Sequence, residues 1–147
     1  MSKGVIWNLD GVLADTAEAH FRAWVTALAQ HEIALDRPTF DKVYGMDNRD
    51  MLTGLLGRPP ENNELETIAG RKEEVFRMEG QWLVRPMPGA LQLLVELEAA
   101  GWLQAVTSLS AKDNIDVVLA ALGVRDRIRA VVGGGDLPVG EQDSKLL

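Results

Sequence analysis

The chain has 147 residues, 46% of them hydrophobic, and its 15 basic and 22 acidic side chains give a net charge of −7. This length suits one ordinary domain, or one small domain carrying an insertion, and the apolar content is sufficient for a buried core. The acidic balance without a basic tract argues against nucleic acid as a partner. The absence of cysteine excludes disulfides, thiolate metal sites and a thiol nucleophile.

The start of the chain lacks the long apolar stretch of a signal peptide, since Asp10 interrupts the first apolar run early. No apolar run in the sequence reaches the length that crosses a bilayer. These two patterns predict a soluble cytoplasmic protein without a membrane partner.

The first predicted element is a buried parallel strand. Residues 4–9 form a short apolar run that ends at Asp10-Gly11, as such a strand followed by a turn would. Three segments with helical spacing of apolar residues come next, with no strand pattern between them. They are 17–31, 39–57 with an interruption at Tyr44-Gly45, and 61–79.

Beyond the connector at 85–89 the pattern alternates between helix and strand. We expect a helix from about residue 89 to Ala100 with Gly101 as its left-handed cap, and a helix over 111–122 that ends at Gly123. Strands are predicted at 102–107 and 130–132, and the last residues are typical of a first helical turn. This alternation predicts an α/β fold with a parallel sheet, and the helical block between the first two strands predicts an inserted domain.

Asn8 and Asp10 stand two residues apart at the carboxyl end of the first predicted strand. Ligands bind at these strand ends in open parallel sheets, and side chains two residues apart can point the same way. Gly11 permits a sharp exit from the strand. An ordinary strand, turn and helix capped by Asp15 or Thr16 would produce the same segment.

The run from Val5 to Thr16 resembles the first signature of the haloacid dehalogenase (HAD) superfamily, which reads Asp-x-Asp-Gly-x-x-x-Asp-Thr. The resemblance implies that position 8 holds the nucleophile and a Mg²⁺ ligand, and that Asp10 is the general acid–base group and a second metal ligand. Residues 15–24 resemble the β-phosphoglucomutase and sugar-phosphate phosphatase branch more closely still. By this likeness His20 lies at the hinge near the phosphate, and Arg49 and Lys72 are cap residues that face the substrate.

Two later segments extend the resemblance over nearly the whole chain. Residues 86–90 resemble the family's return from cap to core. Val106-Thr107-Ser108 resembles the second signature, so Thr107, Ser108 and Gly11 are the implied phosphate-binding residues. Without the family context, a Thr-Ser pair after a strand is usually a turn or a helix start. The implied fold is a Rossmann-like HAD core of residues 1–16 and 85–147, without its C-terminal strands, and a helical cap domain of residues 17–84.

Three departures from the family pattern bear on catalysis. Position 8 carries Asn8, and a neutral amide is a poor nucleophile and a weak ligand for a hard cation. Glu141 stands where the third signature has lysine, with Lys145 about one helical turn further on at ~1.5 Å per residue. The acidic pair of the fourth signature would lie beyond Leu147.

The resemblance implies a Mg²⁺-dependent phosphatase or phosphoglucomutase that handles a small phosphorylated metabolite, with a sugar phosphate favoured, through an aspartyl-phosphate in intact relatives. The substitutions predict that this chain is catalytically impaired and that its Mg²⁺ binding is weak or absent. The alternative is a non-catalytic binding or interaction protein with the same fold, or a fragment. An apolar strand at 4–9, left at a sheet edge, further predicts self-association.

Overall fold

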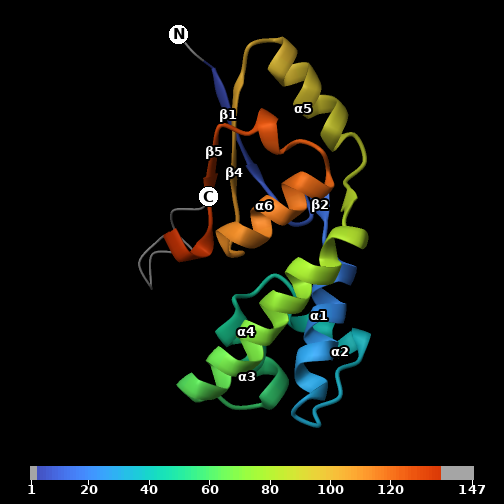
Figure 1. Ribbon diagram of the computed structural model, residues 1–147, viewed down its shortest axis with the longest axis vertical. Helices are drawn as coiled ribbons and strands as arrows, with labels where there is room; N and C mark the ends of the chain where they lie inside the picture. Colours follow the sequence, from blue (N-terminus) through green and yellow to red (C-terminus); the bar gives the residue numbers. More distant parts are fainter. Residues whose placement is uncertain (1–2, 137–147) are drawn as a thin grey trace. The chain divides into compact units, whose positions relative to one another are not determined.

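The computed structural model describes residues 3–136. The chain divides into two compact units, one made of Met1–Thr16 with Val84–Leu147 and the other of Ala17–Leu83. The α-helices and most of the strands of the two units are labelled in Figure 1. None of the helices within the described residues combines the length and the apolar character that a bilayer crossing requires.

A three-stranded parallel sheet in the order β1-β4-β5 is the centre of the first unit. The strands are β1 (Gly4–Asn8), β4 (Leu103–Thr107) and β5 (Ala130–Val132). Their register places Asn8 beside Thr107, and Thr107 beside Val132. The predicted α/β class with a parallel sheet is therefore confirmed, although β1 ends one residue earlier than the apolar run suggested.

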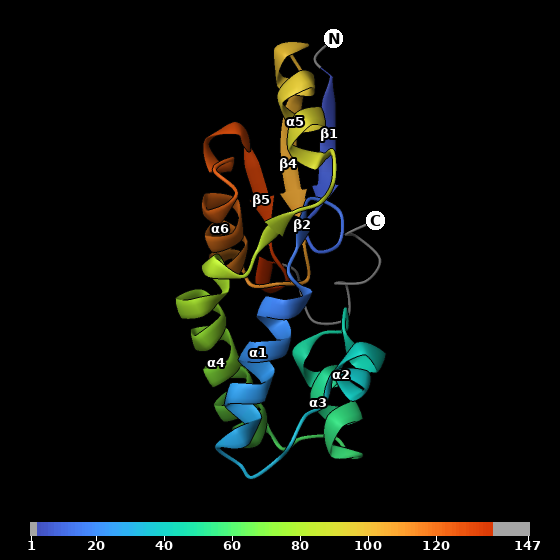
Figure 2. The ribbon, with the colours of Figure 1, turned by 90° about the vertical axis from the view of Figure 1, so that its right-hand side faces the viewer.

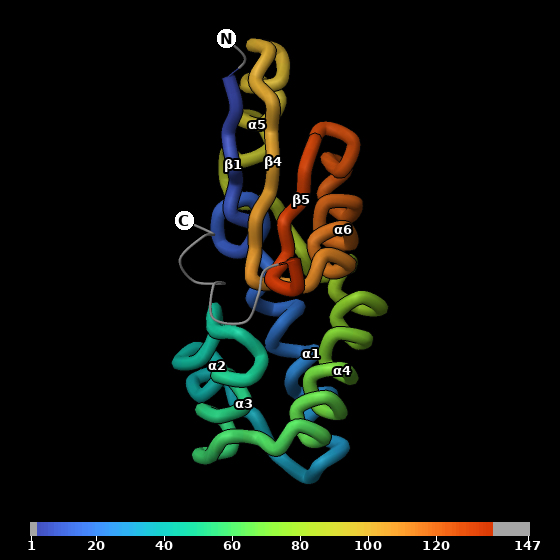
Figure 3. The backbone as a smooth tube through the Cα atoms, turned by 90° about the vertical axis from the view of Figure 1, so that its left-hand side faces the viewer, coloured from blue at the N-terminus to red at the C-terminus, as the bar shows by residue number. Residues whose placement is uncertain are grey.

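Helices cover one face of this sheet. Figures 2 and 3 are opposite views, and α5 (Ala90–Ala99) lies in front of β4 in the first and behind it in the second. The second helix of the unit, α6 (Lys112–Ala121), packs against β5. Trp7, Val106 and Val131 are buried on the covered face. Ile6, on the opposite face, is 73% exposed, so a sheet type that is normally buried on both sides has an open apolar face here.

The second unit consists of helices, as the spacing of apolar residues predicted. They are α1 (Ala17–Ala29), α2 (Arg37–Val43), α3 (Asn48–Leu56), α4 (Asn62–Glu79) and the 3₁₀ turn η1 (Gly80–Trp82). The side chains of Asp36 and Asp47 accept bonds from backbone N–H groups and so cap α2 and α3. The core between the helices includes Trp24, Phe40 and Ile68.

Four short elements had no counterpart in the sequence prediction. Ala14–Asp15 (β2) pairs antiparallel with Arg85–Pro86 (β3), and 3₁₀ turns form at Arg125–Arg127 (η2) and Gly134–Asp136 (η3). Two or three residues are too few to show a hydrophobic period, which is the main sequence signal for such elements. The helical turn expected near the C-terminus falls outside the described residues.

A buried glutamine ties β1, β4 and α5 together. Gln104 is 2% exposed, accepts a 2.9 Å bond from the Trp7 indole Nε1, and donates a 2.9 Å bond to the Leu94 carbonyl. Trp7 and Gln104 are 97 positions apart, so the bond links segments that local structure cannot bring together.

Replacing this glutamine by leucine should therefore destabilise the protein. Gln104→Leu leaves the indole N–H of Trp7 buried without an acceptor, and we expect the free energy of unfolding to fall by about 1–3 kcal/mol. Urea unfolding followed by tryptophan fluorescence measures it. Gln92→Leu is the matched control, because Gln92 is exposed and bonds only Glu96 in the same unit. Equal midpoints for the two variants would contradict a stabilising role for the buried amide.

Candidate functional site

The loop after β1 holds Asp10 at the carboxyl end of the sheet. The Leu9 carbonyl accepts bonds from the N–H groups of Leu13 at 2.9 Å and Ala14 at 3.0 Å, which folds the chain back tightly. Gly11 lies in the left-handed region with φ of 76°, a conformation that favours glycine. Its N–H donates to the Ala14 carbonyl at 2.8 Å, so this predicted phosphate donor is engaged within the loop.

The carboxylate of Asp10 is fixed by two hydroxyl groups from different segments. Thr16 Oγ1 donates to Asp10 Oδ1 at 2.5 Å, and Ser108 Oγ donates to Asp10 Oδ2 at 3.0 Å. Ser108 Oγ in turn accepts the Ser110 N–H at 3.0 Å. Hydrogen bonds to a charged group are short and strong, so this arrangement holds the carboxylate in one orientation.

Two glycines behind the β4–α6 loop allow this arrangement. The Gly134 N–H donates to the Ser110 carbonyl at 3.0 Å. A Cβ at Gly134 would stand 2.2 Å from the Leu109 carbonyl oxygen, and one at Gly133 would stand 2.8 Å from the Lys112 nitrogen. Only glycine therefore permits the backbone after β5 to approach the loop that carries Ser108.

Asn8 and Thr107 are the last residues of two neighbouring strands and are paired in register. The Leu9 N–H donates to Asn8 Oδ1 at 3.0 Å, which fixes the amide so that its nitrogen lies on the other side, 3.5 Å from the Asp10 carbonyl oxygen. Thr107 is 9% exposed, and within the described residues its Oγ1 has no hydrogen-bond partner. An unsatisfied buried hydroxyl costs about 1–3 kcal/mol, which a ligand at this strand end could recover.

The structure therefore gathers four of the predicted residues, Asn8, Asp10, Thr107 and Ser108, at one edge of the sheet. Sequence reasoning considered Thr16 only as a helix cap and missed its bond to Asp10. The signal was present, since Thr16 ends the same motif that contains Asp10. Glu141 and Lys145 lie outside the described residues.

The other predicted residues belong to the helical unit. His20 is buried and stacks on Phe76, with ring centroids 4.3 Å apart. Lys72 is 4% exposed, and its ammonium lies 2.9 Å from Glu73 Oε1 and 5.6 Å from the Phe76 ring centroid. His20 and Lys72 thus contact the same ring. Arg49 is exposed and donates to Asn62 Oδ1 at 3.1 Å.

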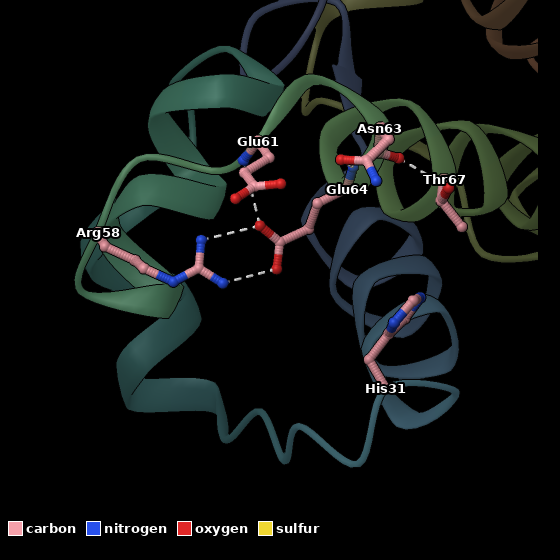
Figure 4. A pocket seen from close by; sticks show the side chains of 6 residues that line it. All are labelled: His31, Arg58, Glu61, Asn63, Glu64 and Thr67. Atoms are coloured by element: carbon pink, nitrogen blue, oxygen red, sulfur yellow. Dashed lines mark hydrogen bonds and ion pairs between the residues drawn. The ribbon is translucent and has the colours of Figure 1, made fainter.

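An open hollow of about 410 Å³ lies elsewhere in the helical unit (Figure 4). It is lined by His31, Arg58, Glu61, Asn63, Glu64 and Thr67. The Arg58 guanidinium bonds both carboxylate oxygens of Glu64 at 2.9 Å, and this bond holds the pKa of Glu64 below its ordinary value. The main charges of the hollow are therefore paired with each other, and it contains none of the predicted site residues.

The residues at the sheet edge do not fit a Mg²⁺ site. Hard cations select several oxygen ligands, chiefly carboxylates. Among residues 3–136, no three histidine or acidic side chains converge in a way that could hold a metal ion. Both carboxylate oxygens of Asp10 accept hydrogen bonds from hydroxyl groups. Asn8 directs its amide nitrogen, rather than its oxygen, towards the Asp10 carbonyl.

The parallel sheet and the polar groups at its carboxyl edge define an α/β protein with a HAD-type site. A sequence profile described as haloacid dehalogenase-like hydrolase matches residues 5–140. The chain belongs to this family.

Two curated relatives align with almost all of the chain. β-Phosphoglucomutase of Bacillus subtilis is 30% identical over 98% of the chain and 66% of its own length. The chloroplastic 5-amino-6-(5-phospho-D-ribitylamino)uracil phosphatase of Arabidopsis thaliana is 25% identical over 97% of the chain and 39% of its own length. The chain thus spans less than two thirds of either relative.

Solved structures share the fold. CbbY from Rhodobacter sphaeroides, in complex with phosphate, superposes with a TM-score of 0.80 at 22% identity, covering 93% of this chain and 65% of that one. An Asp-to-Asn mutant of CbbY in complex with xylulose-1,5-bisphosphate gives a TM-score of 0.77 at the same identity and coverage.

The hydroxyl of Thr16 is expected to stabilise the fold through Asp10. Thr16→Val keeps the shape of this fully buried side chain and removes its bond to the carboxylate. Since hydrogen bonds to charged groups contribute about 1.5–3 kcal/mol, we expect a loss of that size in the free energy of unfolding at neutral pH. Chemical denaturation measures it. Thr16→Ser retains the hydroxyl and should lose less, and the reverse order would show that the bond does not stabilise the fold.

Proposed function

We propose that this chain has a phosphatase-type site that binds a small phosphorylated metabolite, a sugar phosphate in particular, at the carboxyl ends of β1 and β4. Asp10 is its general acid–base group, and turnover is impaired because Asn8 occupies the position of the nucleophile. The observation that supports this most directly is the fixed Asp10 carboxylate, which lies beside the paired ends of two parallel strands.

The geometry suits Asp10 for proton transfer at one point in space. An acid–base catalyst must be within hydrogen-bond reach of the reacting atom and keep its orientation. Thr16 and Ser108 supply that orientation from two sides. Ser108 therefore acts as a positioning residue for Asp10, and Thr107 remains the hydroxyl that can turn to a phosphate oxygen.

Asn8 limits the chemistry that this site can perform. A carboxylate at position 8 would attack the phosphoryl group and form a covalent intermediate, which an amide does poorly. Removal of a nucleophile from an enzyme typically lowers the rate by several orders of magnitude. The alternative function is consequently binding without turnover, in an interaction protein that keeps the fold, and Asn8 and Glu141 are the residues that favour it.

The named relatives support a phosphorylated ligand. They include a phosphoglucomutase, a phosphatase for a ribitylaminouracil phosphate, and a protein solved with phosphate. The CbbY mutant, which has the same fold and carries an Asp-to-Asn substitution, was solved with a sugar bisphosphate bound.

We assign residues 17–84 the role of a cap domain, and residues 1–16 and 85–147 the role of the core. His20, Arg49 and Lys72 are its proposed substrate-facing residues. Helical caps of this kind close over small substrates and exclude water from the reaction. The support is that these residues belong to a separate compact helical unit.

Restoring the nucleophile tests the assignment of position 8. Asn8→Asp should raise Mg²⁺-dependent hydrolysis of p-nitrophenyl phosphate on the order of 100-fold or more above the parent chain, because it permits an aspartyl-phosphate. Adding Asp10→Ala to that variant should abolish the gain. A folded Asn8→Asp variant that hydrolyses no more ester than the parent would refute the idea that the amide alone blocks turnover.

We also propose that the chain self-associates through β1. This strand lies at the edge of the sheet that the structure describes, and its residue Ile6 is exposed on the open face. Unpaired apolar edges readily pair with other chains. Sedimentation velocity at micromolar concentration should show dimers or larger species that Ile6→Lys disperses. Met78→Lys, at an exposed apolar position of the helical unit, should have no effect. A parent chain that sediments as a monomer would rule the proposal out.

A further inference from the structure

We infer that the Asn8–Thr107 strand end binds the tetrahedral oxyanion of a phosphate ester directly, without a divalent cation. The inference rests on the proposed function and deepens it, because it states how the phosphate group is held. It starts from the poor fit of these residues to Mg²⁺.

Two residues paired in register at this strand end carry hydrogen-bond donors. Thr107 Oγ1 is nine-tenths buried, and no described residue bonds it. Asn8 is the register partner of Thr107, so the two side chains leave the sheet on the same face. Because Asn8 Oδ1 accepts the Leu9 N–H, its NH₂ group is the part that remains for a ligand. That group carries two N–H donors, and its one recorded contact is long, at 3.5 Å.

The N-terminus of α6 adds a third attractive element. This ten-residue helix begins at Lys112, a short loop after Thr107, and its N-cap residue Ala111 supplies no side-chain hydrogen bond. The first N–H groups of a helix lack partners within the helix, and the helix dipole favours negative charge there. Because this N-terminus follows Thr107 by only a short loop, it supports an anion held at Thr107 and is not a site by itself.

The charge at the sheet edge also favours phosphate binding without a divalent cation. With aspartate at position 8, two carboxylates would lie beside the bound phosphate, and a cation would be required to offset their repulsion. With Asn8, the only carboxylate among the four gathered residues Asn8, Asp10, Thr107 and Ser108 is that of Asp10. Both of its oxygens accept hydrogen bonds from hydroxyl groups. The substitution therefore removes a negative charge and supplies N–H donors in its place.

Calorimetric titration with inorganic phosphate, at constant ionic strength, tests this inference on the full chain. We expect the same dissociation constant, within about twofold, in EDTA and in excess Mg²⁺. Thr107→Val should weaken phosphate binding by about tenfold, and Thr107→Ser should retain it because the hydroxyl remains. Thr53→Val removes an exposed hydroxyl from the helical unit and serves as the matched control.

A second variant tests the charge argument independently of Thr107. Asn8→Asp should weaken phosphate binding in EDTA by about tenfold and restore it when Mg²⁺ is added. Asn63→Asp makes the same change of charge at an exposed position in the helical unit and should leave phosphate binding unchanged. Circular dichroism confirms that each variant is folded.

The outcomes separate this inference from the proposed function. Phosphate binding by the parent chain that requires Mg²⁺ would overturn the inference and leave the proposed phosphate site in place. A dissociation constant for phosphate that neither Thr107→Val nor Asn8→Asp changes would place the anion elsewhere. That result would overturn the inference as well. No binding of phosphate or of a sugar phosphate under either condition would remove the proposed function together with the inference.

Discussion

The parallel pairing of β1 with β4 is the interaction on which the site depends. It places Asn8 beside Thr107, and it brings Ser108 to Asp10 although the two are 98 positions apart in the chain. Closing such a long loop has an entropic cost, although that cost grows only slowly with length. The buried bond between Trp7 and Gln104 connects the same two strands, so the core of the sheet and the geometry of its edge have a common origin.

Much of this architecture could be predicted from the sequence, because it follows from period and composition. The strand at β1, the helices and the glycine ends at Gly101 and Gly123 are all local patterns. Asn8 and Asp10 could be placed together because ligands bind at the carboxyl ends of parallel strands, whereas Thr107 was implied by the resemblance to the second signature. The hydrogen-bond partners could not be predicted in this way, because they depend on distances between segments that the local sequence pattern does not give. The Ser108 hydroxyl bonds Asp10, whereas the Thr107 hydroxyl finds no partner among residues 3–136, yet the two residues are adjacent in sequence.

In the helical unit, too, the partners of the charged residues could not be predicted from the sequence. Arg49 and Lys72 were expected to face a substrate, but each makes a polar contact within its own unit. The ammonium of Lys72 is the most deeply buried, because Trp24 and Phe76 surround it and Glu73 neutralises it. Glu73 also accepts a 2.7 Å bond from Asn48, which further fixes the position of its carboxylate. A phosphorylated ligand that uses this lysine must compete with an internal carboxylate.

The glycine pair after β5 has a consequence for how this site can change over generations. Gly134 lies in a different segment from Asp10 and Ser108, but any larger residue there would collide with the Leu109 carbonyl and displace the backbone next to Ser108. The orientation of the acid group thus depends on the smallness of a residue in a third segment of the chain. A substitution of Gly134 is therefore expected to disturb the geometry of the site before it disturbs folding. A survey of natural variants should find Gly134 replaced as rarely as Asp10 and Ser108.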